Sequence, residues 1–80
     1  METWTVYILM CADGMTYTGC TNNFEETFWL HNQGQVEATK SRLPLYVVLT
    51  LVFANKYKAF NFEKYLKSGS GRVFMKRHFV

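Results

Sequence analysis

The sequence predicts one small α+β domain over residues 1–80, in which a three-stranded antiparallel sheet is flanked by helices in the order β-β-α-β-α-α. Three observations support this prediction. The chain has 80 residues, too few for two halves that each bury a core. Apolar residues make up 49% of it and aromatic residues 18%, so a packed core is expected rather than disorder. Strand-like and helix-like segments follow one another in that order along the chain.

A β-hairpin is expected at the N-terminus. Residues 4–11 (WTVYILMC) and residues 16–20 (TYTGC) are rich in β-branched and aromatic residues, as strands are. Between them, Asp13-Gly14 is a typical turn signal.

A helix and a third strand follow the hairpin. Asn22 or Asn23 can cap a helix that runs from residue 24 to about residue 32 and stops near Gly34. Residues 45–54 (LYVVLTLVFA) are almost continuously apolar, which predicts a central strand covered on both faces.

Two helices complete the predicted fold. Residues 56–68 have apolar residues at helical spacing, namely Ala59, Phe62 and Leu66. Gly69 is expected to follow as the left-handed residue after this helix, and Ser70 to cap a final basic helix over residues 71–78.

Charge is distributed unevenly along the chain. The net charge of +3 comprises −5 over residues 1–39, which contain no Lys or Arg, and +8 over residues 40–80. Such asymmetry indicates a polyanionic partner for the basic half. The alternative interpretation of this charge is a basic surface that contacts only solvent.

Neither a membrane span nor a disulfide framework is expected. The first residues lack a basic signal-peptide region, and the longest apolar run, residues 43–54, is about half a bilayer span. Two cysteines, Cys11 and Cys20, are expected to be reduced packing residues of a cytoplasmic protein.

Several motifs together resemble the GIY-YIG nuclease superfamily, and in particular its small single-domain members. Val6-Tyr7-Ile8 and Tyr17-Thr18-Gly19 resemble the paired motifs that name it. Further similar stretches cover most of the chain, including His31-Asn32, Ala38-Thr39-Lys40, Arg42-Leu43-Pro44 and residues 62–72 (FEKYLKSGSGR).

The resemblance implies a metal-dependent DNA endonuclease. Tyr7 and Tyr17 would lie beside the scissile phosphate, His31 would assist, and Glu63 would hold one Mg²⁺ or Mn²⁺ ion, with no small-molecule cofactor. The family's helix arginine corresponds to Thr27, which has one neutral donor where a guanidinium offers two charged ones. The activity is therefore expected to be weakened.

Each site residue also has an ordinary structural interpretation. In that interpretation the two tyrosines are strand-forming residues, Glu63 pairs with Lys67, and His31 complements a helix end. A shared site requires both phenols on one face. We therefore expect a three-residue loop over residues 12–14, which pairs Tyr7 with Gly19.

DNA is the expected partner of a monomer or weak homodimer. The basic residues expected to contact it are Lys40, Arg42, Lys64, Lys67, Arg72 and Lys76. The alternatives are a nucleic-acid-binding module that has kept the fold but cleaves nothing, and a structural or protein-interaction domain.

Overall fold

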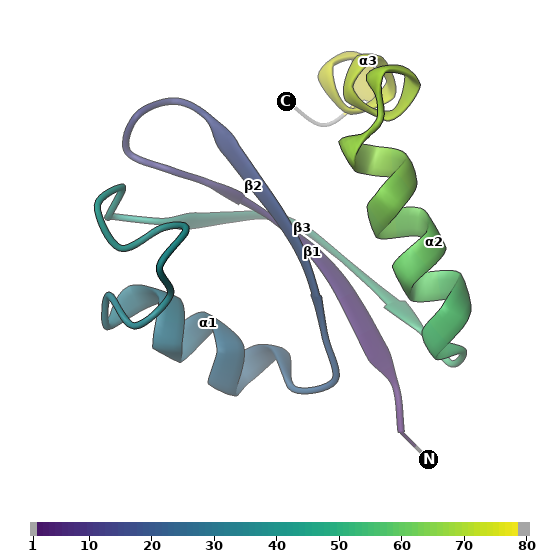
Figure 1. Cartoon of the computed structure of the whole chain (residues 1–80), viewed down its shortest axis with the longest axis horizontal. Helices are drawn as coiled ribbons and strands as arrows, with labels where there is room; N and C mark the ends of the chain where they lie inside the picture. The colour runs from purple at the N-terminus through teal and green to yellow at the C-terminus, as the bar shows by residue number, and fades with distance from the viewer. Residues whose placement is uncertain (1, 79–80) are drawn as a thin grey trace.

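The central element of the fold is strand β1 (Trp4–Met10). The computed structural model describes residues 2–78, and in it β1 pairs antiparallel with both β2 (Thr16–Thr21) and β3 (Tyr46–Phe53). The three-stranded sheet has the order β2-β1-β3 and lies between the helices (Figure 1). The predicted α+β fold with a three-stranded antiparallel sheet is confirmed.

The hairpin has the predicted three-residue loop. The Cys11 N–H donates to the Met15 carbonyl at 2.9 Å, and Gly14 has the left-handed φ of +81° that this loop requires. In the resulting register Tyr7 lies opposite Gly19, and Leu9 lies opposite Tyr17. Both phenols are therefore on one face of the sheet, as predicted.

Helices cover the two faces of the sheet separately. Helix α1 (Phe24–Asn32) packs against the face that carries Tyr7 and Leu9. Helices α2 (Lys56–Lys67) and α3 (Gly69–His78) pack against the opposite face, which carries Val6 and Ile8. Each face has its own small core, and the two free cysteines pack one into each.

The prediction that residues 45–54 form a central strand covered on both faces is wrong. β3 is an edge strand, and Tyr46 and Val52 are 63% and 64% exposed. A continuous apolar run is typical of a strand buried on both faces, but β1 has such a run too and occupies the centre. Val48, Leu49 and Phe53 of β3 are instead partly buried against the core beneath α2 and α3.

Local caps define the helices. Asn23 caps α1 through the Glu26 N–H, as one of the two predicted candidates, and Asn55 caps α2. Within the described residues, no helix combines the length and apolar character of a membrane span.

The predicted boundary between α2 and α3 is wrong. Ser68, rather than Ser70, caps α3, because its hydroxyl accepts from the Gly71 N–H at 3.1 Å and its carbonyl from the Arg72 N–H at 2.9 Å. Gly69 is the first residue of α3 rather than a left-handed residue after α2. One serine in an extended conformation makes the turn, so no separate left-handed glycine is needed.

Candidate active site

Two tyrosines and a histidine gather between the sheet and α1. The ring centroids of Tyr7 and Tyr17 lie 6.3 Å apart, and those of Tyr17 and His31 lie 5.3 Å apart. β1 and β2 position the phenols, and α1 positions His31, which lies seven residues after Phe24 on the same inward face. Three of the residues that sequence analysis selected are thus in direct proximity.

A buried chain of hydrogen bonds passes through His31. Its Nε2 lies 3.1 Å from the Tyr7 hydroxyl, and its Nδ1 lies 2.8 Å from Thr39 Oγ1. Tyr7, His31 and Thr39 are 4%, 1% and 0% exposed. His31 is therefore a buried partner of Tyr7 and not a solvated residue at a helix end.

Thr39 is the residue that sequence analysis missed. It lies in the irregular segment between α1 and β3, where no periodicity distinguishes it from its polar neighbours. Only the fold shows that this threonine is completely buried against His31. In the sequence, only the resemblance of Ala38-Thr39-Lys40 to a stretch of the family includes Thr39.

Burial keeps both members of the Tyr7–His31 pair neutral near pH 7. Desolvation is the main cause that raises the pKa of Tyr7 far above 10.0, and the charges of Tyr17, Glu63 and Cys20 raise it further. Desolvation also lowers the pKa of His31 below 6.5. Tyr7 is accordingly a phenol that can donate a hydrogen bond, and His31 is an imidazole.

Gly19 provides the space that the Tyr7 ring occupies. A Cβ atom at position 19 would overlap the hydroxyl and ring carbons of Tyr7. The phenol therefore lies directly over the backbone of the edge strand β2. Only glycine permits this approach.

Thr27, which the sequence resemblance matches to the family's arginine, lies on the face of α1 that packs against the sheet. It is half-buried, and its Oγ1 lies 2.8 Å from Thr21 Oγ1 near the end of β2. This short hydrogen bond joins the helix to the strand. α1 itself carries no lysine or arginine.

Glu63 approaches the site from the other side of the sheet. It lies on α2, its side chain is 17% exposed, and its Oε2 accepts from Lys67 Nζ at 2.9 Å. Its charge nevertheless raises the pKa of both Tyr7 and Cys20. The carboxylate therefore acts on the phenol across the edge of the sheet, without a hydrogen bond between them.

The donor set suits only a sparsely liganded cation. Within residues 2–78, no three His, Cys, Asp or Glu side chains gather as a metal-binding group. A single carboxylate, that of Glu63, fits Mg²⁺ or Mn²⁺, which prefer oxygen and retain several water ligands. The same set does not fit a structural zinc site.

The predicted DNA-binding residues divide into two groups. Lys40 pairs with Glu37 at 3.0 Å, and Arg42 pairs with Asp13 at 2.8 Å and holds the pKa of that carboxyl below its usual value. Arg42 thereby fastens the hairpin loop to the segment before β3. Four others lie on α2 and α3: Lys64, Lys67, Arg72 and Lys76.

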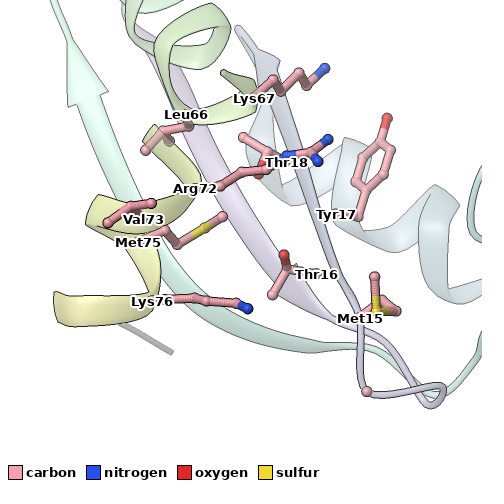
Figure 2. Close-up of a pocket in the computed structure, with 11 residues that line it drawn as sticks. Met15, Thr16, Tyr17, Thr18, Leu66, Lys67, Arg72, Val73, Met75 and Lys76 are labelled. Atoms are coloured by element: carbon pink, nitrogen blue, oxygen red, sulfur yellow. The ribbon is translucent and has the colours of Figure 1, made fainter. Parts of the chain in front are cut away.

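Three of those four line one groove. It has a volume of about 620 Å³ and lies between β2 and the α2–α3 junction. Lys67, Arg72 and Lys76 line it, and Tyr17 belongs to the strand on its other side (Figure 2). Lys64 is exposed and is not among the lining residues.

Comparison with known proteins places these features in one family. The family model described as the GIY-YIG catalytic domain matches residues 3–78. A UPF0213 protein of Clostridium perfringens is 43% identical over 63 residues, 78% of this chain and 68% of that protein. A UPF0213 protein of Bacillus licheniformis is 39% identical over 62 residues, 76% of this chain and 64% of that protein.

Longer matches cover nearly the whole chain. A UPF0213 protein of Lacticaseibacillus paracasei is 32% identical over 99% of this chain and 93% of its own length. The solution NMR structure of a UPF0213 protein from Bacillus halodurans superposes with a TM-score of 0.61 at 33% identity. That superposition covers 92% of this chain and 80% of the other. The chain spans slightly less than two thirds of the length of some of these relatives, 64% and 61% in two of them.

Proposed function

Because the chain belongs to the GIY-YIG family and has its nuclease-type fold, we propose that it is a metal-dependent DNA endonuclease of reduced activity. The proposed reaction is hydrolysis of a phosphodiester bond. A bond forms from a water oxygen to phosphorus, and the bond to the leaving sugar oxygen breaks. The observation that carries the proposal is the placement of Tyr7, Tyr17 and His31 on one face, with Tyr7 joined to His31.

The two phenols have different roles in this proposal. Tyr17 is half-buried at the edge strand, so it can contact the attacking water. Tyr7 is buried and neutral, so it serves as a hydrogen-bond donor to the phosphate. One His31 tautomer is suited to this task. It accepts from the Thr39 hydroxyl at Nδ1 and donates from Nε2 to the Tyr7 oxygen, which leaves the phenol hydrogen for the substrate.

Glu63 is the residue proposed to hold the divalent ion. Its carboxylate is the acidic group whose charge acts on Tyr7. When bound, a divalent ion neutralises phosphate charge and favours ionisation of a coordinated water. Lys67 forms an ion pair with this carboxylate at 2.9 Å. Its ammonium group would have to move away for Glu63 to bind the ion.

Thr27 is the reason for proposing reduced activity. Phosphoryl transfer places negative charge on the nonbridging oxygens, and loss of a guanidinium that meets it typically costs about 10²–10⁵ in rate. Thr27 supplies one neutral hydroxyl, and that hydroxyl is engaged with Thr21.

A binding module that cleaves nothing is the second candidate function. Lys67, Arg72 and Lys76 share one groove, which favours contact with a polyanion. The same groove argues against a structural domain with scattered surface charge. The two nucleic-acid hypotheses differ only in whether the phenol cluster performs chemistry.

The decisive experiment introduces an arginine at position 27. Supercoiled plasmid is incubated with the wild type, Thr27→Arg and Thr27→Arg/Glu63→Ala, each with and without Mg²⁺ or Mn²⁺. Glu25→Arg is the matched control, because it adds an arginine to the exposed part of the same helix. Circular dichroism verifies that each variant is folded.

The nuclease proposal expects Thr27→Arg to nick DNA about 100-fold faster than the wild type or more, only with metal and not in the Glu63→Ala background. Glu25→Arg should remain at the wild-type rate. If no folded variant nicks DNA although all bind it, the binding module is the function. If none binds or cuts, both nucleic-acid hypotheses are wrong.

A further inference from the structure

The groove between β2 and α3 has two chemically different surfaces. Residues 14–18 of the hairpin form one wall, and the end of α2 with α3 forms the other. Arg72 and Lys76 reach from α3 toward β2, whereas the phenol of Tyr17 lies beyond that strand (Figure 2). Because β2 is an edge strand, a ligand in the groove can pass over its edge to the phenols without crossing the sheet.

Positive charge dominates the rim of the groove. None of its eleven lining residues is acidic. Lys67 is paired with Glu63, but within the described part of the chain no carboxylate lies at ion-pairing distance from Arg72 or Lys76. These two cations are therefore available to an anionic ligand.

The interior of the groove is apolar. Leu66 and Met75 are buried beneath it, and Val73 is 57% exposed in its wall. A ligand that fits both surfaces carries an anionic group next to a flat apolar one. A volume of about 620 Å³ is in the range of sites that enclose a small organic ligand.

We propose that the groove binds a single-stranded segment of nucleic acid, with one phosphate at Arg72, the neighbouring phosphate at Lys76, and an unpaired base against Val73 and Met75. A duplex keeps its bases stacked inside and offers only phosphates, whereas an unpaired base can enter an apolar groove. The inference rests on the proposed function, because the bound strand continues over the edge of β2 to place its next phosphodiester beside Tyr17.

Binding without cleavage tests the assignment. Fluorescence anisotropy in EDTA follows a labelled oligothymidine of about 12 nucleotides, long enough for one such site. Its comparison ligands are an abasic oligonucleotide with the same number of phosphates and the corresponding duplex. Arg72→Gln/Lys76→Gln removes the two cations, and Lys56→Gln/Lys58→Gln removes two exposed charges of α2 outside the groove.

Each comparison has a defined expectation. Each phosphate contact to a single strand contributes about 0.7 to the slope of log affinity against log salt, so Arg72→Gln/Lys76→Gln should reduce that slope by about 1.4. The Lys56→Gln/Lys58→Gln control should change it by less than about 0.7, the contribution of a single contact. Base contacts of about 1–3 kcal/mol should make the abasic ligand bind at least 5-fold more weakly.

Three outcomes would overturn the assignment: equal affinity for the abasic ligand, a duplex that binds as tightly as the single strand, or equal effects of the two double substitutions. Val73→Glu should weaken binding, whereas Val52→Glu, the same change on the exposed edge of β3, should not. Equal effects of these two would also contradict it. Since EDTA excludes cleavage, normal single-strand binding combined with failure of every nicking assay would refute the nuclease proposal and leave the groove assignment intact.

Discussion

Replacement of Gly19 by alanine tests the geometry on which the candidate site depends. The added Cβ would overlap the hydroxyl and ring carbons of Tyr7, which is only 4% exposed and packs among buried neighbours. Overpacking of this kind costs about 1–3 kcal/mol. Displacing the phenol also removes the partner of the buried His31 Nε2, at a further cost of about 1–3 kcal/mol. The expected loss of unfolding free energy is thus about 2–6 kcal/mol.

Urea denaturation followed by circular dichroism measures this loss. With a slope near 1 kcal/mol/M, as expected for a domain of this size, the midpoint should fall by about 2 M or more. In a Tyr7→Leu background the overlap is removed, and Gly19→Ala should become neutral or slightly stabilising, because alanine is about 0.5–1 kcal/mol better than glycine in a strand. An equal cost of Gly19→Ala in both backgrounds would refute the placement of the Tyr7 ring over β2.

Four other changes follow from the structure. Gly71→Ala places a Cβ against the backbone of α2 and should cost about 3 kcal/mol, whereas Gly69→Ala meets no atom within 4 Å and should be neutral; thermal unfolding distinguishes them. Thr39→Val leaves His31 Nδ1 without its hydroxyl partner and should cost about 1–3 kcal/mol in urea unfolding, which Thr39→Ser should largely restore. Burial lowers the pKa of His31 below 6.5. The unfolded chain therefore binds more protons than the folded one as the pH decreases below about 6.5, and stability should fall there. The urea midpoint should be lower at about pH 5.5 than at about pH 7.5, and this difference should be smaller in His31→Gln. Val52→Lys, at a position that is 64% exposed, should change the urea midpoint by less than about 0.5 M, and a loss of several kcal/mol would contradict the edge position of β3.

Local rules in the sequence predicted the hairpin and the N-terminal cap of α1 better than the arrangement of the strands. The loop over residues 12–14 follows from the chemistry of Asp13-Gly14 and the need to place two phenols together. The order of the strands depends on which of two similarly apolar segments the helices cover. β3 has almost no polar residues along its length, yet it lies at the edge, and no local pattern distinguishes it from β1.

The candidate site divides in the same way. Tyr7, Tyr17 and His31 lie in motifs that resemble those of the family, so the sequence alone was sufficient to assign them to one site. Thr39 is functional in the proposal only because the segment between α1 and β3 folds back onto His31. The placement of Glu63 across the sheet edge likewise depends on how α2 packs, which its helical spacing does not specify.

The three-residue loop also determines which changes of length the hairpin can tolerate. Successive strand residues point to alternate faces, so the number of loop residues acts as a parity switch for the second tyrosine. Removal of one residue from positions 12–14 would preserve two strands and a turn but direct Tyr17 to the α2 side. An insertion of two residues keeps the parity and leaves the phenols together. Among relatives with this hairpin, the parity of the loop should therefore vary less than its length or composition.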